Sequence, residues 1–395
     1  MKILITNFHS IQNKGDLGIV LGLMAGLRAK WPQASFSLIG RQSDEREWWA
    51  NRGINFYQPV LTYQPTSRLA FLVFLFKFWQ TLRTIRTSQS AVLEAYREAD
   101  LVISKGGSFF REPEYKRNWL PVGILGHLHQ LLIAKKLGKP IVLSAQSFGP
   151  INNPITRLIL RRVFRRLALI TVRDGDSARW LGKVLKIKNV SVVGDSAFLL
   201  KSSPTTIKLS TDGKPIVGLT VRTWGQPQES KNYRQAIIAL IENHTGQFQF
   251  VFMPQVIGPK AYEDDRLVAE AIVNQLSVTA RLSTMVIKDD LSPSELIDLY
   301  HQTDFFIATR LHSAIFALLA DRPILAIGYE PKTVGVLGDL GLTDWVIDIR
   351  SIDAKVLSDC FASLLEASGT VFSRATDQAR VAANKNIDLI SDLIK

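Results

Sequence analysis

The segment FFIATRLHSAIFALLADRPILAIGYEPK, residues 305–332, decides the fold class. It contains an apolar strand pattern over 305–308, a helical pattern over 312–320 and a second apolar strand pattern over 324–327. Short apolar runs joined by a helical segment of this length are typical of parallel strands with crossover helices. Polar residues follow both strands, so the candidate ligand contacts lie at the carboxyl edge of the predicted sheet.

The same alternation extends outward over the whole chain. In the second half it predicts strands at 216–221, 248–253 and 284–287, and helices at 232–243, 264–276 and 294–302. In the first half it predicts strands at 2–6, 35–39, 101–104, 141–145 and 169–172, helices at 17–29 and 123–137, and a helix that ends at 94–99. The first half is therefore expected to hold four or five strands of one sheet.

The length of 395 residues favours two domains, because single cores stop growing at about 250 to 300 residues. A polar interlude at 201–214 is the predicted linker, between an N-terminal domain over 1–200 and a C-terminal domain over 215–395. Both are expected to be doubly wound α/β domains of the Rossmann type. We expect them to face each other across a ligand cleft at the carboxyl ends of the two sheets.

Composition excludes several classes of protein. With 46% hydrophobic and 21% charged residues the chain is not disordered, and the lone Cys360 excludes an intramolecular disulfide or a CxxC site. The net positive charge of +13 comes entirely from the first half of the chain. Residues 1–200 hold 29 basic and 12 acidic side chains, net +17, whereas 201–395 hold 19 and 23, net −4. An excess of this kind suits an anionic membrane face, nucleic acid or a polyanionic substrate.

The sequence favours a cytoplasmic protein, since the apolar run at the N-terminus is too short for a signal peptide. The apolar stretch 69–79 is too short to span a bilayer, but no acidic residue lies between Glu47 and Glu94. A helix-like run over 155–169 carries basic residues opposite apolar ones. Peripheral contact with the inner face of the plasma membrane competes with a simpler interpretation, a buried helix and a solvated surface helix. Nucleic acid is not expected, because no binding motif accompanies the charge.

Several loops at strand ends in the first half offer candidate contacts. Asn13 and Asp16 stand in a polar loop before the first helix, which Asp16 could cap. Gly106, Gly107 and Ser108 could present backbone amides and a hydroxyl to an anion or a sugar. Gln146 lies on the same predicted edge. Asp174 and Asp176 could bind a metal ion, but a helix cap at Asp174 or Ser177 explains the same residues, and no metal site is expected.

The densest set of candidates lies in the second half. Arg310 and His312 stand where a strand gives way to a helix N-terminus, a position that favours anions and the neutral imidazole. Lys332 follows the next strand, and Arg222 follows the strand at 216–221. Several cations with one titratable histidine imply a small polyanion that undergoes proton transfer. No Ser-His-Asp set can be assigned.

Taken together, these residues resemble the polysaccharide pyruvyl transferase family over nearly the whole chain. The motifs that carry the resemblance are Asn13–Asp16, Gly106–Ser108, Gln146 with Gly149-Pro150, Arg173-Asp174 with Ser177, Val217-Gly218 with Arg222, Met253-Pro254-Gln255 with Asp264-Asp265, Arg310–Ser313, and Tyr329 with Pro331-Lys332. The resemblance implies two Rossmann-type domains arranged as in GT-B enzymes. It also implies transfer of the enolpyruvyl unit of phosphoenolpyruvate onto a sugar as a cyclic ketal, with no cofactor.

The resemblance also implies roles for particular residues. Arg310 and Lys332 would hold the carboxylate and phosphate of phosphoenolpyruvate, His312 would be the acid/base, and Arg173 would contribute from the N-terminal domain. We add Asp16 as a second proton-transfer group. Where the family often has Asp-Pro, this chain has Asp195 followed by serine. The acidic residue expected after the double glycine is displaced to Glu112, which puts acceptor contacts in question.

Two other functions remain open at this level. A glycosyltransferase with a nucleotide-sugar donor would share the architecture, because fold does not fix function. The second alternative is a membrane-associated scaffold protein without enzymatic activity. The presence of Arg310, His312 and Lys332 argues against it. Members of the family act on cell-surface polysaccharide units, often carried on polyprenyl diphosphate, and such an anionic acceptor would suit the basic N-terminal half.

Overall fold

The computed structural model describes residues 1–61, 68–112, 122–209, 213–225, 227–258 and 260–394. The chain forms two compact units. Unit 1 comprises Met1–Ile11, Ile19–Ser196 and Ala382–Lys395, and unit 2 comprises Gln12–Gly18 and Ala197–Val381. The helices α1 and α15 therefore each contribute residues to both units.

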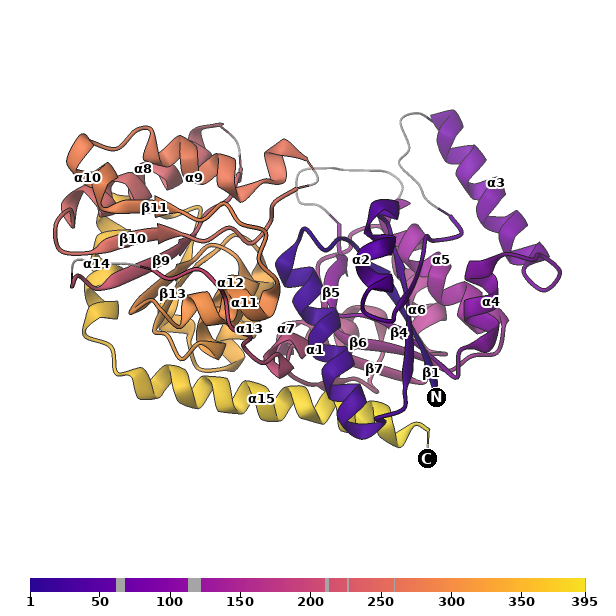
Figure 1. Ribbon diagram of the computed structural model, residues 1–395. Helices are drawn as coiled ribbons and strands as arrows, with labels where there is room; N and C mark the ends of the chain where they lie inside the picture. The colour runs from indigo at the N-terminus through magenta and orange to yellow at the C-terminus, as the bar shows by residue number, and fades with distance from the viewer. Residues whose placement is uncertain (62–67, 113–121, 210–212, 226, 259, 395) are drawn as a thin grey trace. The chain divides into compact units, whose positions relative to one another are not determined.

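Unit 1 is built on a parallel sheet of strand order β3-β2-β1-β4-β6-β7-β8, with β5 paired to β6 (Figure 1). Its strands are β1 (Lys2–Phe8), β2 (Ser35–Gly40), β3 (Asn55–Tyr57), β4 (Leu101–Ser104), β5 (Gly107–Phe110), β6 (Ile141–Phe148), β7 (Leu169–Val172) and β8 (Ser191–Val192). Its helices are α2 (Arg46–Ala50), α3 (Arg68–Thr84), α4 (Ala91–Glu98), α5 (Val122–Lys136), α6 (Pro154–Phe164) and α7 (Gly175–Trp180), together with most of α1 (Lys14–Lys30). Every residue of β4 and β6 is buried, which explains why these strands are continuous apolar runs.

Unit 2 repeats the design with the strand order β11-β10-β9-β12-β13-β14, again parallel. Its strands are β9 (Ile216–Thr220), β10 (Gln249–Phe252), β11 (Thr284–Val286), β12 (Phe305–Ala308), β13 (Ile324–Gly328) and β14 (Val346–Asp348). Its helices are α8 (Pro227–Asn243), α9 (Asp265–Val273), α10 (Val278–Leu282), α11 (Pro293–Tyr300), α12 (Leu311–Leu319), α13 (Pro331–Asp339), α14 (Ala354–Leu365) and the first part of α15 (Gly369–Asp392). The predicted class, two doubly wound α/β domains, is confirmed.

Most predicted elements exist close to their expected bounds. The strands predicted at 101–104, 169–172 and 305–308 are β4, β7 and β12, with the expected bounds. The estimate of four or five strands in the first half was too low, because the described sheet of unit 1 has eight strands. The missed strands β3 and β8 contain three and two residues, too few to produce a recognisable pattern, whereas β5 begins with Gly-Ser and is mostly half-buried, so it lacks a continuous apolar run.

The stretch predicted as helical over 155–169 ends earlier than expected. Helix α6 stops at Phe164, and Leu169 already begins β7. Its faces also differ from the prediction, because Leu160 and Val163 are buried whereas Leu158 is 48% exposed. The outward face therefore combines apolar side chains with the exposed arginines Arg162, Arg165 and Arg166.

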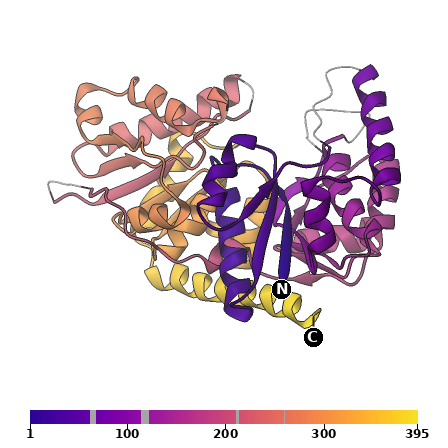
Figure 2. The same ribbon diagram turned by 45° about the vertical axis from the view of Figure 1, so that its right-hand side comes forward.

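Helix α3 is not the buried helix of the simpler interpretation. Its inner side packs against α5 through Phe74 and through Phe78, whose ring centroid lies 4.7 Å from that of His129. Its outer side exposes 62% of Leu72, 63% of Phe76 and 55% of Trp79. Figures 1 and 2 show α3 at the outer side of unit 1. In the described part of the chain, no helix is both long and apolar enough to cross a membrane.

The polar interlude at 201–214 belongs to unit 2, and its residues 210–212 lie outside the described ranges. Backbone amides of this segment bind α11 and the turn after it. The Thr205 amide donates to Asp298 (2.9 Å), and the Leu209 amide donates to Gln302 (2.9 Å).

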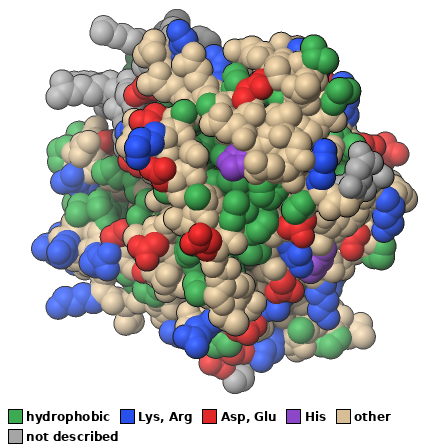
Figure 3. Space-filling view, turned by 90° about the vertical axis from the view of Figure 1, so that its left-hand side faces the viewer, with side chains coloured by type: hydrophobic (Ala, Val, Ile, Leu, Met, Phe, Trp, Pro, Cys, Tyr) green, Lys and Arg blue, Asp and Glu red, His purple; other side chains and the backbone are tan. Residues whose placement is uncertain are grey.

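On the molecular face in Figure 3, acidic and basic side chains are interspersed.

Candidate active site

The strand register of unit 2 brings several polar turns to one edge of its sheet. Ala308 of β12 pairs with Thr220 of β9, and β13 lies beside β12. Arg222, Arg310 and the turn at 329–332, which follow these strands, therefore leave the sheet at the same carboxyl edge. The strand order reverses between β9 and β12, and open α/β sheets bind ligands at such a point.

A hydroxyl network fixes the turn between β12 and α12. Ser313 Oγ donates to the Arg310 carbonyl (2.7 Å) and accepts from the Arg310 amide (3.3 Å). It also lies 2.8 Å from Thr220 Oγ1, which accepts the Thr309 amide (2.9 Å). These bonds satisfy buried backbone groups at the start of α12. They hold His312 in the first turn of that helix.

Arg310 forms a bidentate ion pair with Asp265, whose side chain is only 2% exposed. Arg310 Nε lies 2.9 Å from Oδ2 and Nη2 lies 2.5 Å from Oδ1. Burial opposes the guanidinium charge, but Asp265 more than compensates and raises the pKa of Arg310. Asp265 also accepts the amides of Gln255 (3.1 Å) and Val256 (2.9 Å). The pair directs the Nη1 edge of the guanidinium away from the carboxylate.

Sequence reasoning gave Asp265 no role. The signal was present, since Asp264-Asp265 follows Met253-Pro254-Gln255 closely and both were among the motifs of the resemblance. The sequence did not indicate that Asp265 pairs with Arg310, because Arg310 lies 45 residues further along the chain.

The loop Gln12–Gly18 belongs to unit 2 although it follows the first strand of unit 1. Asn13 forms an antiparallel bridge with Val256, and the Lys14 amide donates to the Gln255 carbonyl (2.9 Å). The backbone of this early loop is therefore joined to the loop that follows β10.

Gly15 packs directly against His312. A Cβ atom on Gly15 would lie 2.5 Å from Nδ1, 2.6 Å from Cγ and 2.8 Å from Cβ of His312, closer than real Cβ atoms approach. Asp16 is the next residue, and its amide donates to Asn13 Oδ1 (3.1 Å). Asn13 therefore caps α1, which begins at Lys14, and the suggested cap at Asp16 is wrong.

The remaining predicted cations flank the same turns. The Arg222 guanidinium carbon lies 3.9 Å from the Tyr329 ring centroid, and Arg222 Nε donates to the Thr223 carbonyl (3.0 Å). Lys332 Nζ lies 2.5 Å from Glu330 Oε2. Their side chains are 19% and 27% exposed, so this pair is partly shielded from water.

Arg173, a predicted contact of unit 1, lies in a buried ion pair. Its Nη1 is 2.5 Å from Asp195 Oδ2, both side chains are 1% exposed, and Nε donates to Ser147 Oγ (2.8 Å). Ser147 donates to Asp174 (2.7 Å), which accepts the Ser177 amide (2.7 Å). The capping role of Asp174 is confirmed. The contact of Arg173 with a substrate stays a prediction.

Gln146 of β6 and the two glycines after β4 lie where these neighbouring strands meet. The Gln146 side chain is buried, and its Nε2 donates to the Lys105 carbonyl. A Cβ on Gly106 would lie 3.0 Å from a carbonyl of β6, so glycine permits the close approach. Gly107 and Ser108 are half-buried at the start of β5. Among the described residues, no three His, Cys, Asp or Glu side chains gather as a metal site would require.

Comparison with known proteins decides the family. A family model described as polysaccharide pyruvyl transferase matches residues 13–331. The chain belongs to the polysaccharide pyruvyl transferase family. The match includes Gly15, Arg310 and His312 and ends one residue before Lys332.

One relative of this member of the family matches over its full length. The amylovoran biosynthesis protein AmsJ of Erwinia amylovora is 26% identical over 439 aligned residues, covering 100% of this chain and 99% of that protein. The family and this relative together identify a transferase of polysaccharide biosynthesis.

Solved structures support the fold. A UDP-N-acetylglucosamine 2-epimerase described as putative, from Listeria monocytogenes, matches with a TM-score of 0.62 at 11% identity, covering 100% of this chain and 95% of that one. A UGT transferase from Siraitia grosvenorii in complex with UDP matches with a TM-score of 0.57 at 14% identity, covering 100% of both chains. MurG from Acinetobacter baumannii matches with a TM-score of 0.52 at 12% identity, covering 99% of both chains. At these identities the likeness concerns the fold alone.

Proposed function

We propose that this pyruvyl transferase moves the pyruvyl group of phosphoenolpyruvate onto a sugar of a cell-surface polysaccharide, or of its lipid-linked precursor, as a cyclic ketal. The observation that carries the proposal is the cluster at the carboxyl edge of unit 2. There Asp265 holds Arg310 in a bidentate ion pair. His312 follows two residues later, in the first turn of α12, and contacts Gly15. A fixed guanidinium beside an imidazole at a helix N-terminus suits an anion that exchanges protons.

The donor accounts for the cations at this edge. Phosphoenolpyruvate carries about three negative charges, and planar arginine donors bind both carboxylate and phosphate. In the proposal, Arg310 and Lys332 bind these two groups, and Arg222 adds a third cation. Asp265 offsets one positive charge and fixes the direction of Arg310, so recognition depends on geometry as well as on charge.

The chemistry requires two proton transfers. One sugar hydroxyl loses its proton and forms a C–O bond to C2 of the enolpyruvyl unit, while the methylene carbon gains a proton and becomes a methyl group. The second hydroxyl forms its own bond to C2 as phosphate leaves, and the second hydroxyl proton departs with the phosphate. His312 is the principal proton shuttle in this scheme, and Asp16 is the second group.

The decisive experiment supplies phosphoenolpyruvate and a panel of lipid-linked saccharides and measures the products by mass spectrometry. We expect a product heavier than the acceptor by one pyruvate less one water. The His312→Ala variant is expected to lose about 100-fold in turnover, the usual size of a general acid/base contribution. Near-normal turnover of this variant would remove the assignment of His312. Thermal stabilisation by UDP and not by phosphoenolpyruvate would instead favour a nucleotide-sugar glycosyltransferase.

A lipid-linked acceptor would bring the protein to a membrane surface, and α3 is suited to that contact. Leu72, Phe76, Trp79 and Arg83 recur on one exposed face of the helix, and the Arg83 guanidinium lies 4.1 Å from the Trp79 ring centroid. Apolar side chains that end in an aromatic ring and a cation are typical of interfacial helices.

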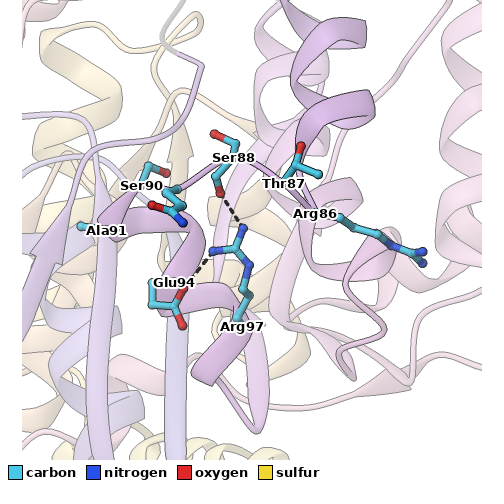
Figure 4. A pocket seen from close by; sticks show the side chains of 8 residues that line it. Arg86, Thr87, Ser88, Ser90, Ala91, Glu94 and Arg97 are labelled. Carbon is cyan, nitrogen blue, oxygen red and sulfur yellow. Dashed lines mark hydrogen bonds and ion pairs between the residues drawn. The ribbon is translucent and has the colours of Figure 1, made fainter.

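The polar turn after α3 forms a pocket of about 540 Å³. In Figure 4, Arg97 lies between Ser88 and Glu94, whereas Arg86 extends away from them. Arg97 donates to Glu94 (2.8 Å) and to the Ser88 carbonyl (2.6 Å). At a bilayer, Arg86 would face the anionic headgroups.

Vesicle binding tests this contact. We expect the wild-type chain to co-sediment with vesicles of phosphatidylcholine and phosphatidylglycerol, and the double variant Phe76→Ser/Trp79→Ser to bind at least about tenfold more weakly, since each lost ring removes apolar burial. Leu282→Ser is the matched control, because Leu282 is 81% exposed in unit 2. Equal binding by the double variant and the control would exclude α3 as the contact.

A further inference from the structure

A second histidine lies at the carboxyl edge of the unit 1 sheet, and the proposed chemistry does not use it. His127 of α5 places Nδ1 2.8 Å from Oδ1 of Asn7, which lies near the end of β1. The Asn7 amide is oriented by its own bonds, because Nδ2 donates to Ser104 Oγ (3.0 Å). Its Oδ1 therefore faces the imidazole. The Nδ1 atom of His127 then carries the proton, and Nε2 presents a lone pair.

Asn7 is held in an unusual backbone conformation to make this contact. Its φ is +67°, in the left-handed region that residues other than glycine rarely adopt. The conformation is stabilised by the backbone N–H of Asn7, which donates to Gln130 Oε1 (3.0 Å). Gln130 lies one helical turn from His127 on α5. Strained backbone that several bonds enforce is found preferentially at functional sites.

Cations surround the other side of this imidazole. Arg41, which follows β2, donates from Nη2 to His127 Nε2 (3.3 Å), and the buried Lys105, which follows β4, donates to the Gly106 carbonyl (2.9 Å). Burial, then Arg41, Lys105 and His9, lower the pKa of His127 well below its ordinary value. An imidazole of this kind stays neutral, so its Nε2 can accept a hydrogen bond but does not readily take up a proton, and it suits recognition of a hydroxyl better than proton transfer.

The ring of Phe109 completes the arrangement. It stacks on His127 with centroids 4.3 Å apart and an interplanar angle of 26°. A Cβ on Gly107 would lie 2.9 Å from Phe109, so the glycine leaves room for the ring. The double glycine predicted as a ligand contact thus supports the histidine. We call Asn7, Arg41, Lys105 and His127 the His127 cluster.

We propose that the His127 cluster is a binding subsite for an anionic saccharide: Arg41, which donates to Nε2 of His127 in the free chain, binds the anionic group, and a sugar hydroxyl then donates to Nε2 in its place. This proposal rests on the proposed function, since it assigns the acceptor a place in unit 1. The anionic group is either a uronate carboxylate or the diphosphate of a lipid-linked sugar. Both present oxygens that a guanidinium binds well.

A binding experiment tests the subsite without requiring turnover. The chain has six histidines, so ¹⁵N-histidine labelling gives few resonances, and His127→Gln assigns the one of interest. We expect methyl glucuronide or pyrophosphate to shift the His127 Nε2 resonance. Arg41→Gln, at an exposed position, should weaken that binding about tenfold, as loss of a charged hydrogen bond does. A response to the glucuronide identifies the uronate, and one to pyrophosphate identifies the diphosphate.

Neutral methyl glucoside is the control probe. An equal response to the glucoside, with no effect of Arg41→Gln, would overturn the role of the anion. No response to any of the three probes would overturn the subsite. An intact resonance response in a chain that forms no ketal product would refute the proposed function and leave the subsite standing.

Kinetics separate recognition from proton transfer once an acceptor is known. His127→Gln is expected to raise the KM for the acceptor about tenfold, to leave the KM for phosphoenolpyruvate within about twofold, and to leave the pH profile of kcat unchanged. A fall in kcat with a changed pH profile and an unchanged acceptor KM would show that His127 transfers protons, contrary to the proposal.

Discussion

Replacement of Gly15 by alanine is expected to lower turnover about 100-fold while the chain stays folded. The added Cβ would lie within 2.8 Å of the Nδ1, Cγ and Cβ atoms of His312. Two of these atoms lie at the root of the side chain, so a small rotation of the ring cannot relieve the clash, and His312 must leave its position. In an ordinary helix the same change would be stabilising by about 1 kcal/mol.

Gly126→Ala is the matched control for this variant. Gly126 lies in α5, and no described atom lies within 4 Å of a Cβ built there. We expect that variant to keep its activity and to melt at or slightly above the wild-type temperature. Full activity of Gly15→Ala in the ketal assay, measured beside its melting temperature, would show that the position of His312 does not matter for turnover.

Removal of the Asp195 carboxylate is expected to lower the free energy of unfolding of unit 1 by about 3 to 5 kcal/mol. In Asp195→Ala, the Arg173 guanidinium would remain at 1% exposure with Ser147 as its described neutral partner. A buried charge without its counter-charge is costly, whereas the pair itself contributes little net stability. Hydrogen exchange of β6 and β7 peptides in increasing urea would measure the loss.

The exposed pair of Asp176 and Arg179 provides the control. Their side chains are 61% and 64% exposed, so Asp176→Ala should change stability by less than about 1 kcal/mol. Unchanged exchange protection in Asp195→Ala would contradict the structural role of this carboxylate. A normal stability with a raised substrate KM would instead assign Arg173 to binding.

The sequence predicted the interior strands well because parallel strands covered on both faces must be apolar throughout, as β4 and β6 are. The edge strands β3 and β8 contain three and two residues and leave no such pattern. The exposure of one face of α3 could not be predicted from the sequence either. An apolar helix in the sequence looks the same whether a neighbour covers its second face or not.

The candidate residues of unit 2 followed from the rule that ligands bind at strand ends. Their partners did not, because Asp265 and Arg310 meet only after the sheet has formed. The helix cap shows the same limit. Asn13 and Asp16 are both good caps, and the choice was decided by the bridge from Asn13 to Val256, more than 240 positions away in the sequence.

Helix α15 has a consequence for how the protein is made. Residues from Ala382 onward belong to unit 1, where the buried Asn386 accepts a hydrogen bond from Thr171 (2.8 Å) and donates one to Ser144 (2.9 Å). These partners lie in β7 and β6, which are synthesised more than 200 residues earlier. On the ribosome, the sheet of unit 1 therefore waits for the synthesis of Asn386 before the Asn386 bonds to Ser144 and Thr171 can form. Unit 2, which needs the loop Gln12–Gly18, already has that segment outside the exit tunnel when its own strands appear.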